Sequence, residues 1–183
     1  MRLEPIERPP SVLGRVLDAA IRRTLGRSIT PSQVVYNRVP AAWRISLAFQ
    51  LFERFGSKLP SELRLLVTTR VAQLNGCAFC QDIKRAMAVR EALGTAKFDA
   101  LADWRGSDRF SERERAALAF VEEAATGLRP SDATFEAASR SFDEREIAEL
   151  ALLLAIESFY NRMNLALGIE ASDGLEALAR RRD

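Results

Sequence analysis

The chain has 183 residues, which is enough for one helical domain with a full hydrophobic core. Hydrophobic residues make up 48% of it and charged residues 28%, a balance that excludes an intrinsically disordered chain. The formal net charge of +2 is too small to indicate binding to nucleic acid. No apolar run reaches the roughly 20 residues of a transmembrane helix, and the charged N-terminus does not look like a signal sequence. We therefore expect a cytoplasmic protein that binds neither nucleic acid nor a membrane.

Apolar residues recur at helical spacing along most of the chain, and no stretch alternates convincingly as a strand. Proline and glycine fall between the helical patterns and do not form a linker. We predict an all-α fold in a single domain that spans residues 1–183. The expected helices cover residues 11–26, 30–37, 40–56, 60–75, 77–94, 95–104, 111–127, 133–139, 143–168 and 173–181.

Two of these helices begin with the pattern of a capping box, in which a starting side chain and a later glutamate satisfy each other's free N–H groups. The pairs are Ser111 with Glu114 and Asp143 with Glu146. The second pair opens the longest apolar run, residues 143–168. This helix is expected to be mostly buried.

Polar residues interrupt that apolar run near its end. They are Glu157, Tyr160, Asn161, Arg162 and Asn164. Buried polar groups need partners, so we expect these side chains to line a pocket or a subunit contact.

The two cysteines of the chain form a Cys-x-x-Cys motif, Cys77 and Cys80. Asn75 and Gly76 precede it and permit a helix break, because they tolerate the left-handed conformation. The motif therefore opens a helix, where free N–H groups and the helix dipole favour a thiolate. Sulfurs at this spacing can reach disulfide distance, and a close pair without a signal peptide indicates redox chemistry in a reducing compartment. Two buried structural thiols are the alternative interpretation.

The residues that could hold a metal or cofactor are few. A structural zinc site needs four ligands, and the chain has no histidine and no cysteine outside this pair. No flavin or haem motif is present either. We expect neither a metal nor a cofactor.

The sequence around the motif resembles a known family. Residues 63–80 read Leu-Arg-Leu-Leu-Val-x-x-Arg-Val-Ala-Gln-Leu-Asn-Gly-Cys-Ala-Phe-Cys, and an amphipathic helix ending in Leu-Gly follows. This pattern is similar to the carboxymuconolactone decarboxylase superfamily, in its alkyl hydroperoxidase D-like, peroxidase-related branch. The resemblance is strong over residues 60–94 and weaker over the second half. It implies an alkyl hydroperoxidase D-like helical bundle that assembles as a homo-oligomer (trimer, dimer or hexamer) and reduces hydroperoxides with its cysteine pair.

The helix-end argument and the family resemblance assign different roles to the two cysteines. A free helix end favours Cys77 as the attacking thiol, because that sulfur lies nearer the end. The resemblance favours Cys80, because the family's relay histidine lies one helical turn after the second cysteine. We predict that Cys80 attacks and that Cys77 resolves, with a dithiol reductant protein as the partner that regenerates the pair.

Two relay positions of the family hold other residues in this chain. Lys84 stands at the histidine position and Leu65 at the glutamate position. On a helix Lys84 shares a face with Cys80, so its ammonium would favour the thiolate; an exposed surface lysine is the alternative. Glu62, one turn before Leu65, is a candidate displaced relay or a partner of the helix dipole. The resemblance also implies that Phe79, which by default packs in the core, forms part of the wall around a bound peroxide.

The predicted catalytic set is therefore Cys80, Cys77, Lys84 and Glu62, acting on a hydroperoxide or another small molecule. Two other functions stay open at this point. One is a lyase that acts on a small lactone, which would release carbon dioxide. The other is a non-catalytic helical assembly protein without a proton relay. Rapid disulfide formation on addition of peroxide would separate the first function from both.

Overall fold

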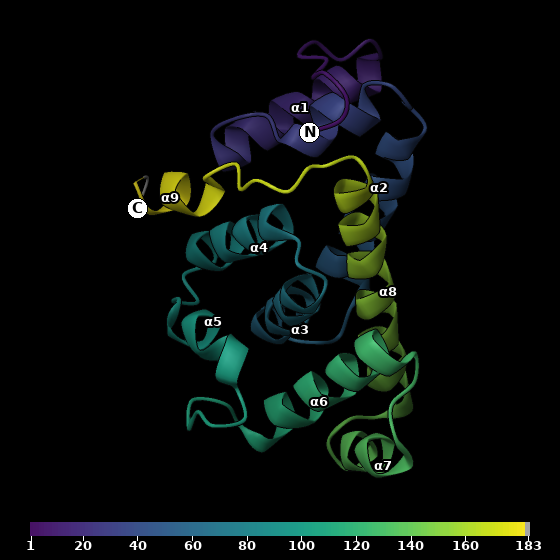
Figure 1. The fold of residues 1–183 in the computed structure, drawn as a ribbon, viewed down its shortest axis with the longest axis vertical. Helices are drawn as coiled ribbons and strands as arrows, with labels where there is room; N and C mark the ends of the chain where they lie inside the picture. Colours follow the sequence, from purple (N-terminus) through teal and green to yellow (C-terminus); the bar gives the residue numbers. More distant parts are fainter. Residues whose placement is uncertain (182–183) are drawn as a thin grey trace.

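The helix that leads into the cysteine motif, α3 (Ser61–Leu74), lies at the centre of the molecule (Figure 1). The computed structural model describes residues 1–181, so the last two residues of the predicted domain lie outside the described part. An all-α fold is confirmed, and the described residues contain no strand. Buried side chains lie on every side of α3, among them Leu63, Leu66 and Val67. A helix with buried side chains on every side must be covered from all sides, and neighbouring helices do this for α3.

The other elements follow the predicted order. They are α1 (Val12–Leu25), the π-helical turn η1 (Ser32–Tyr36), α2 (Ala42–Leu51), the π-helical turn η2 (Phe52–Gly56), α4 (Ala78–Arg90), α5 (Ala96–Ala100), the 3₁₀ turn η3 (Leu101–Asp103), α6 (Glu112–Gly127), α7 (Asp132–Ser141), α8 (Glu144–Ala166) and α9 (Leu175–Arg180).

Both predicted capping boxes are formed. The Ser111 side chain accepts from the Glu114 N–H while the Glu114 carboxylate accepts from the Ser111 N–H, and α6 begins there. Asp143 and Glu146 make the same reciprocal pair at the start of α8. These two helix starts are fixed by contacts within four residues, which is why the sequence alone was sufficient to place them.

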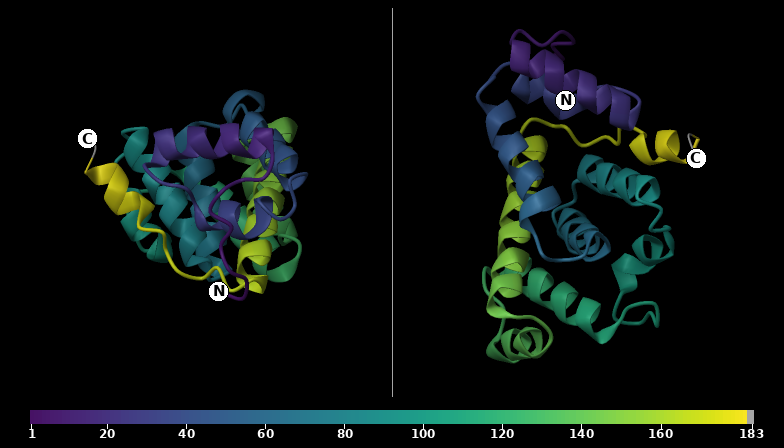
Figure 2. Two further views of the ribbon diagram at one scale, coloured as in Figure 1. Left: turned by 90° about the horizontal axis from the view of Figure 1, so that it is seen from above. Right: turned by 180° about the vertical axis from the view of Figure 1, so that it is seen from behind.

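The helices pack in two groups around α3. At one end α6 packs against α3 and α8, and α7 packs against α6 and α8; at the other end α1 lies across the molecule, while α2 runs beside α8 (Figure 1). Figure 2 shows from behind that α1 keeps this place, on the far side of α4 from α6. The long helix α8 crosses α3 and runs between the two ends. None of the described helices is both long and apolar enough to span a bilayer.

The C-terminal segment returns to the cysteine helix. Helix α9 packs along α4, and the Asp82 carboxylate on α4 accepts hydrogen bonds from the N–H groups of Leu175 and Glu176, at 2.8 and 3.0 Å. Gly174 precedes α9 and has no side chain with which to cap it. Asp82 therefore acts as the N-cap of α9 from another helix, and it fixes α9 onto the helix that carries both cysteines.

Candidate active site

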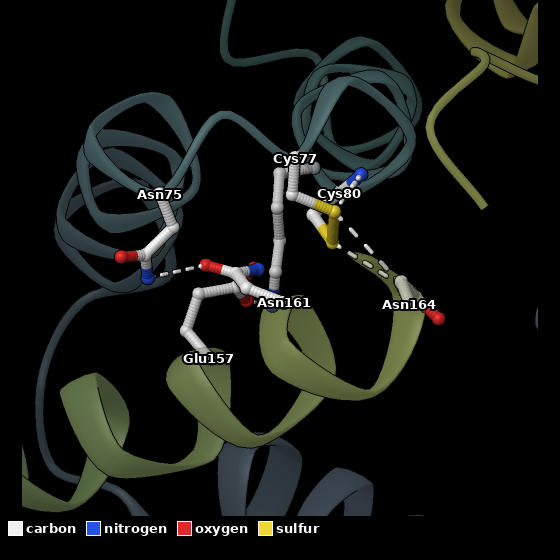
Figure 3. Close-up of a disulfide and its surroundings, with 7 residues drawn as sticks. Asn75, Cys77, Cys80, Glu157, Asn161 and Asn164 are labelled. Atoms are coloured by element: carbon white, nitrogen blue, oxygen red, sulfur yellow. Dashed lines mark hydrogen bonds and ion pairs between the residues drawn. A yellow bond between two sulfur atoms is a disulfide. The ribbon is translucent and has the colours of Figure 1, made fainter. Parts of the chain in front are cut away.

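The chain reverses between α3 and α4, and this reversal places both cysteines. Gly76 has φ of +71°, a left-handed conformation that glycine adopts without steric cost. Cys77 is the N-cap of α4, and its sulfur accepts the Cys80 N–H at 3.3 Å. The two sulfurs are joined in a disulfide of 2.09 Å (Figure 3). The predicted break and the cysteine pair at a helix start are both confirmed.

A cavity of about 430 Å³ lies beside this disulfide. Residues of α1, η1, α2, η2, α3, α4 and α8 line it, so the N-terminal helices form one wall and the cysteine helix another. Cys80 lines the cavity, together with Phe79 and Leu65, whereas Cys77 does not. Cys77 is 0% and Cys80 2% exposed. Cys80 is therefore the cysteine that a molecule in the cavity would meet.

The polar residues that interrupt α8 turn toward the cavity, as one of the two sequence interpretations expected. Glu157, Tyr160 and Asn164 line it. Asn161 is buried beside them; it donates to Glu157 Oε1 at 2.6 Å and accepts from Asn75 at 2.8 Å (Figure 3). Arg162 is exposed and points elsewhere. Four of the five polar residues thus share the face of α8 that meets the cysteine helix, and two of them, Glu157 and Asn161, are hydrogen-bonded to each other.

Lys84 also lines the cavity, four residues after Cys80. Its ammonium lies 3.3 Å from Glu157 Oε2 and 3.7 Å from Glu53 Oε2. Its side chain is only 12% exposed, so the alternative of a surface lysine is wrong. Burial works to lower the Lys84 pKa, but the charges of Glu53 and Glu157 outweigh it and raise the pKa above its ordinary value. Lys84 therefore stays an ammonium and can donate a proton, but it cannot accept one.

Glu157 is the partner of Lys84 that the sequence did not identify. Burial raises the pKa of Glu157, and the opposing effects of Lys84 and of the Asn161 hydrogen bond offset this only in part. Its Oε2 makes no hydrogen bond with any described residue apart from the ion pair to Lys84. A glutamate inside an apolar helix was a visible signal, but its partner lies on a distant stretch of the chain.

The structure does not bring Glu62 to the cysteines. Its carboxylate accepts a hydrogen bond from Lys97 at 3.1 Å, and Lys97 also binds Glu114 at 2.7 Å. Glu62 does not line the cavity, whereas Leu65, at the family's glutamate position, does. Of the predicted catalytic set, Cys80, Cys77 and Lys84 lie together, and the carboxylates beside Lys84 come from Glu157 and Glu53 instead of Glu62.

A phenol completes the polar side of the cavity. The Tyr160 hydroxyl lies 3.2 Å from Ser46 Oγ. Burial raises the pKa of Tyr160, so the phenol is neutral at pH 7 and can donate a hydrogen bond.

Comparison with known sequences agrees with this arrangement. The sequence model of the carboxymuconolactone decarboxylase family matches residues 39–123, which include the cysteine motif and Lys84. The Escherichia coli protein YnjA is 34% identical over 174 residues, covering 93% of this chain and 94% of YnjA. The chain belongs to the carboxymuconolactone decarboxylase superfamily. The resemblance noted in the sequence is thereby confirmed.

Solved structures show the same alkyl hydroperoxidase D-like fold. A cysteine-to-alanine variant of the debrominase Bmp8, in complex with 2,3,4-tribromopyrrole, matches with a TM-score of 0.83 and 21% identity, covering 100% of this chain and 98% of Bmp8. An uncharacterized peroxidase-related protein from Ralstonia eutropha, described as an alkylhydroperoxidase AhpD core, matches with a TM-score of 0.76 and 20% identity, covering 97% of this chain and 98% of that protein. At these low identities, the comparison shows that the two structures and this chain share a fold.

Proposed function

We propose that the protein is a thiol oxidoreductase that reduces hydroperoxides through a dithiol–disulfide cycle of Cys77 and Cys80. The observation that carries the proposal is the position of the pair. The two cysteines are bonded to each other, and one of them lies on the wall of a cavity large enough for a small organic molecule. An oxidant in the cavity would contact Cys80, and Cys77, which does not line the cavity, would act as the resolving thiol.

The proposed reaction has two steps. The Cys80 thiolate attacks the terminal, hydrogen-bearing oxygen of the hydroperoxide, the O–O bond breaks, and Cys80 becomes a sulfenic acid while an alkoxide leaves. The Cys77 thiol then condenses with the sulfenic acid, which forms the disulfide and releases water. A dithiol reductant protein returns two electrons and two protons by thiol–disulfide exchange.

Lys84 supplies the proton that the leaving oxygen needs. Water has a pKa of about 15.7 and lysine about 10.4 in ordinary surroundings, so hydroxide or alkoxide takes a proton from an ammonium even when the lysine pKa is raised. Glu157 and Glu53 hold the ammonium in the cavity. When the disulfide is reduced again, one of the reductant's two protons returns to Lys84 and the other stays on Cys77.

The size of the cavity favours an organic hydroperoxide over hydrogen peroxide. A volume of about 430 Å³ is many times the roughly 30 Å³ that one water molecule occupies in the liquid. The walls opposite Cys80 carry Leu17, Ile21 and Trp43, which suit an apolar substituent.

A second candidate function uses the same cysteines. The structural neighbour Bmp8 is a debrominase, and an apolar cavity with aromatic walls beside a cysteine pair would also suit a halogenated aromatic ring. The dithiol would supply two electrons and two protons: the carbon–bromine bond becomes a carbon–hydrogen bond, bromide and a proton leave, and the disulfide forms.

Thiol titration with hydroperoxide tests the proposal. The reduced protein is mixed with one equivalent of cumene hydroperoxide, and free thiols are counted. We expect two thiols lost per chain in the wild type, and one in Cys77→Ser, with a sulfenic acid that dimedone traps. Cys80→Ser should lose no thiol rapidly. Full peroxide-linked turnover by Cys80→Ser would overturn the proposal.

The second candidate is separated by its products. Incubation of the reduced protein with 2,3,4-tribromopyrrole should release one bromide per disulfide formed if dehalogenation is the function, and none if it is not. Release of carbon dioxide from a small lactone, retained in Cys80→Ser, would instead indicate the lyase activity of the superfamily.

A further inference from the structure

Asn164 is the side chain of α8 that contacts the cysteine pair. Its Nδ2 lies 3.4 Å from Cys80 Sγ and 4.0 Å from Cys77 Sγ (Figure 3). It is 1% exposed, and it lines the cavity with Cys80. Its own backbone carbonyl accepts the N–H groups of Leu167 and Ile169 at the end of α8, so the side chain starts from a fixed backbone.

The Asn164 N–H donor stabilises Cys80 most when Cys80 is reduced. A disulfide sulfur is a weak acceptor, whereas a thiolate carries a full charge, and hydrogen bonds to charged groups are about twice as strong as neutral ones. Burial of Cys80 works against its thiolate, because few other groups can solvate the charge. The Asn164 N–H therefore stabilises the state of Cys80 that attacks more than the state in which it rests.

We infer that Asn164 is a further catalytic residue: its amide N–H donates a hydrogen bond to the Cys80 sulfur and stabilises the attacking thiolate. This inference rests on the proposed thiol chemistry. The charged and titratable groups that share the cavity are Lys84, Glu53, Glu157, Arg64, Tyr36 and Tyr160, together with Glu91 and Arg54 toward its ends. All of them stay unchanged in the test, so a shift in the Cys80 titration reports on Asn164.

The test is the rate of iodoacetamide alkylation against pH, in a Cys77→Ser background where Cys80 is the remaining thiol. Asn164→Leu removes the donor at nearly constant size, and we expect the midpoint to rise by about one pH unit, which is about tenfold less thiolate below the midpoint. Asn164→Asp, also of matched size, should raise it at least as much, because a carboxylate repels the thiolate. Asn75→Ala removes an amide hydrogen bond to the same face of α8 without touching sulfur, and its midpoint should equal that of the parent. Circular dichroism checks that each variant is folded.

Unchanged midpoints in both Asn164 variants, or an equal shift in Asn75→Ala, would overturn the sulfur contact. Alkylation needs no hydroperoxide, so these midpoints decide the role of Asn164 even if the wild type proves not to reduce peroxides.

Discussion

Lys84 Nζ lies 3.3 Å from Glu157 Oε2, and this ion pair joins the cysteine helix to the long helix α8 beneath it. The Glu157 side chain is almost fully buried and that of Lys84 nearly so. Removing charges from water is costly, so a buried pair adds little net stability over two apolar residues. Loss of one partner is strongly destabilising, because the other charge is then buried without compensation.

A double-mutant cycle on this pair should therefore be strongly non-additive. Lys84→Met leaves Glu157 buried with Glu53 as a like-charged neighbour, and we expect a loss of about 3 kcal/mol in the free energy of unfolding. Glu157→Gln keeps the Asn161 hydrogen bond but leaves the lysine with Glu53 alone, so it should cost less. The double variant should be more stable than the sum predicts by at least about 1 kcal/mol, as measured by urea unfolding at pH 7. Additivity within about 0.5 kcal/mol would show that the two groups do not interact.

The same two substitutions should move the Cys80 thiol pKa in opposite directions. Lys84→Met removes a cation four residues from Cys80 and leaves two carboxylates, so the thiol pKa should rise by about one unit. Glu157→Gln removes a carboxylate and should lower it. Lys84→Arg keeps the charge and serves as the control. The measurement is the pH profile of alkylation in the Cys77→Ser background, and identical profiles for Lys84→Met and Lys84→Arg would contradict an electrostatic role for Lys84.

Local signals in the sequence were sufficient for the helices, and long-range packing decided the site. The capping box at Ser111 and the break at Gly76 each depend on a few neighbouring residues, so the pattern alone located them. The sequence singled out Lys84 by its position after Cys80, and Glu157 as a charged residue in an apolar helix. Their pairing requires α8 to lie across α4, which no local pattern specifies. The cavity needs walls from the N-terminal helices as well, so the sequence could name its polar residues but could not outline it.

Glu149 should make the protein sensitive to acid. Burial works to raise the Glu149 pKa, but hydrogen bonds from Ser57 Oγ, from Arg145 and from the N–H groups of residues 58 and 59 outweigh it and lower the pKa. The folded state therefore favours the ionised carboxylate. Its contribution is fully present above the ordinary carboxyl pKa near 4.5 and is lost as the pH falls through the lower folded-state value.

Glu149→Gln tests this pH dependence. At pH 7 the variant should be less stable than the wild type by about 2 kcal/mol, because the amide cannot replace charged hydrogen bonds to the loop before α3. The difference should shrink as the pH falls from 5 to 3, where the wild-type carboxylate is itself protonated. Glu144→Gln, at an exposed position of the same helix, is the matched control and should show no such change. A wild-type advantage that stays constant down to pH 3 would rule out this titration.

Asp82 should hold α9 over the cysteine helix, so its removal should have local consequences near Cys77. Asp82→Ala deletes both hydrogen bonds to the start of α9, and loss of such a cap costs about 1–2 kcal/mol. Leu175 belongs to the same apolar cluster as Cys77, so loosening α9 should expose that sulfur. We expect faster amide hydrogen exchange over residues 175–180 and, in a reduced Cys80→Ser background, several-fold faster alkylation of Cys77. Asp132→Asn, an exposed acid at the start of α7, should change neither rate. Exchange in α9 that is unaffected by Asp82→Ala would mean that its apolar contacts with α4 hold it in place without this cap.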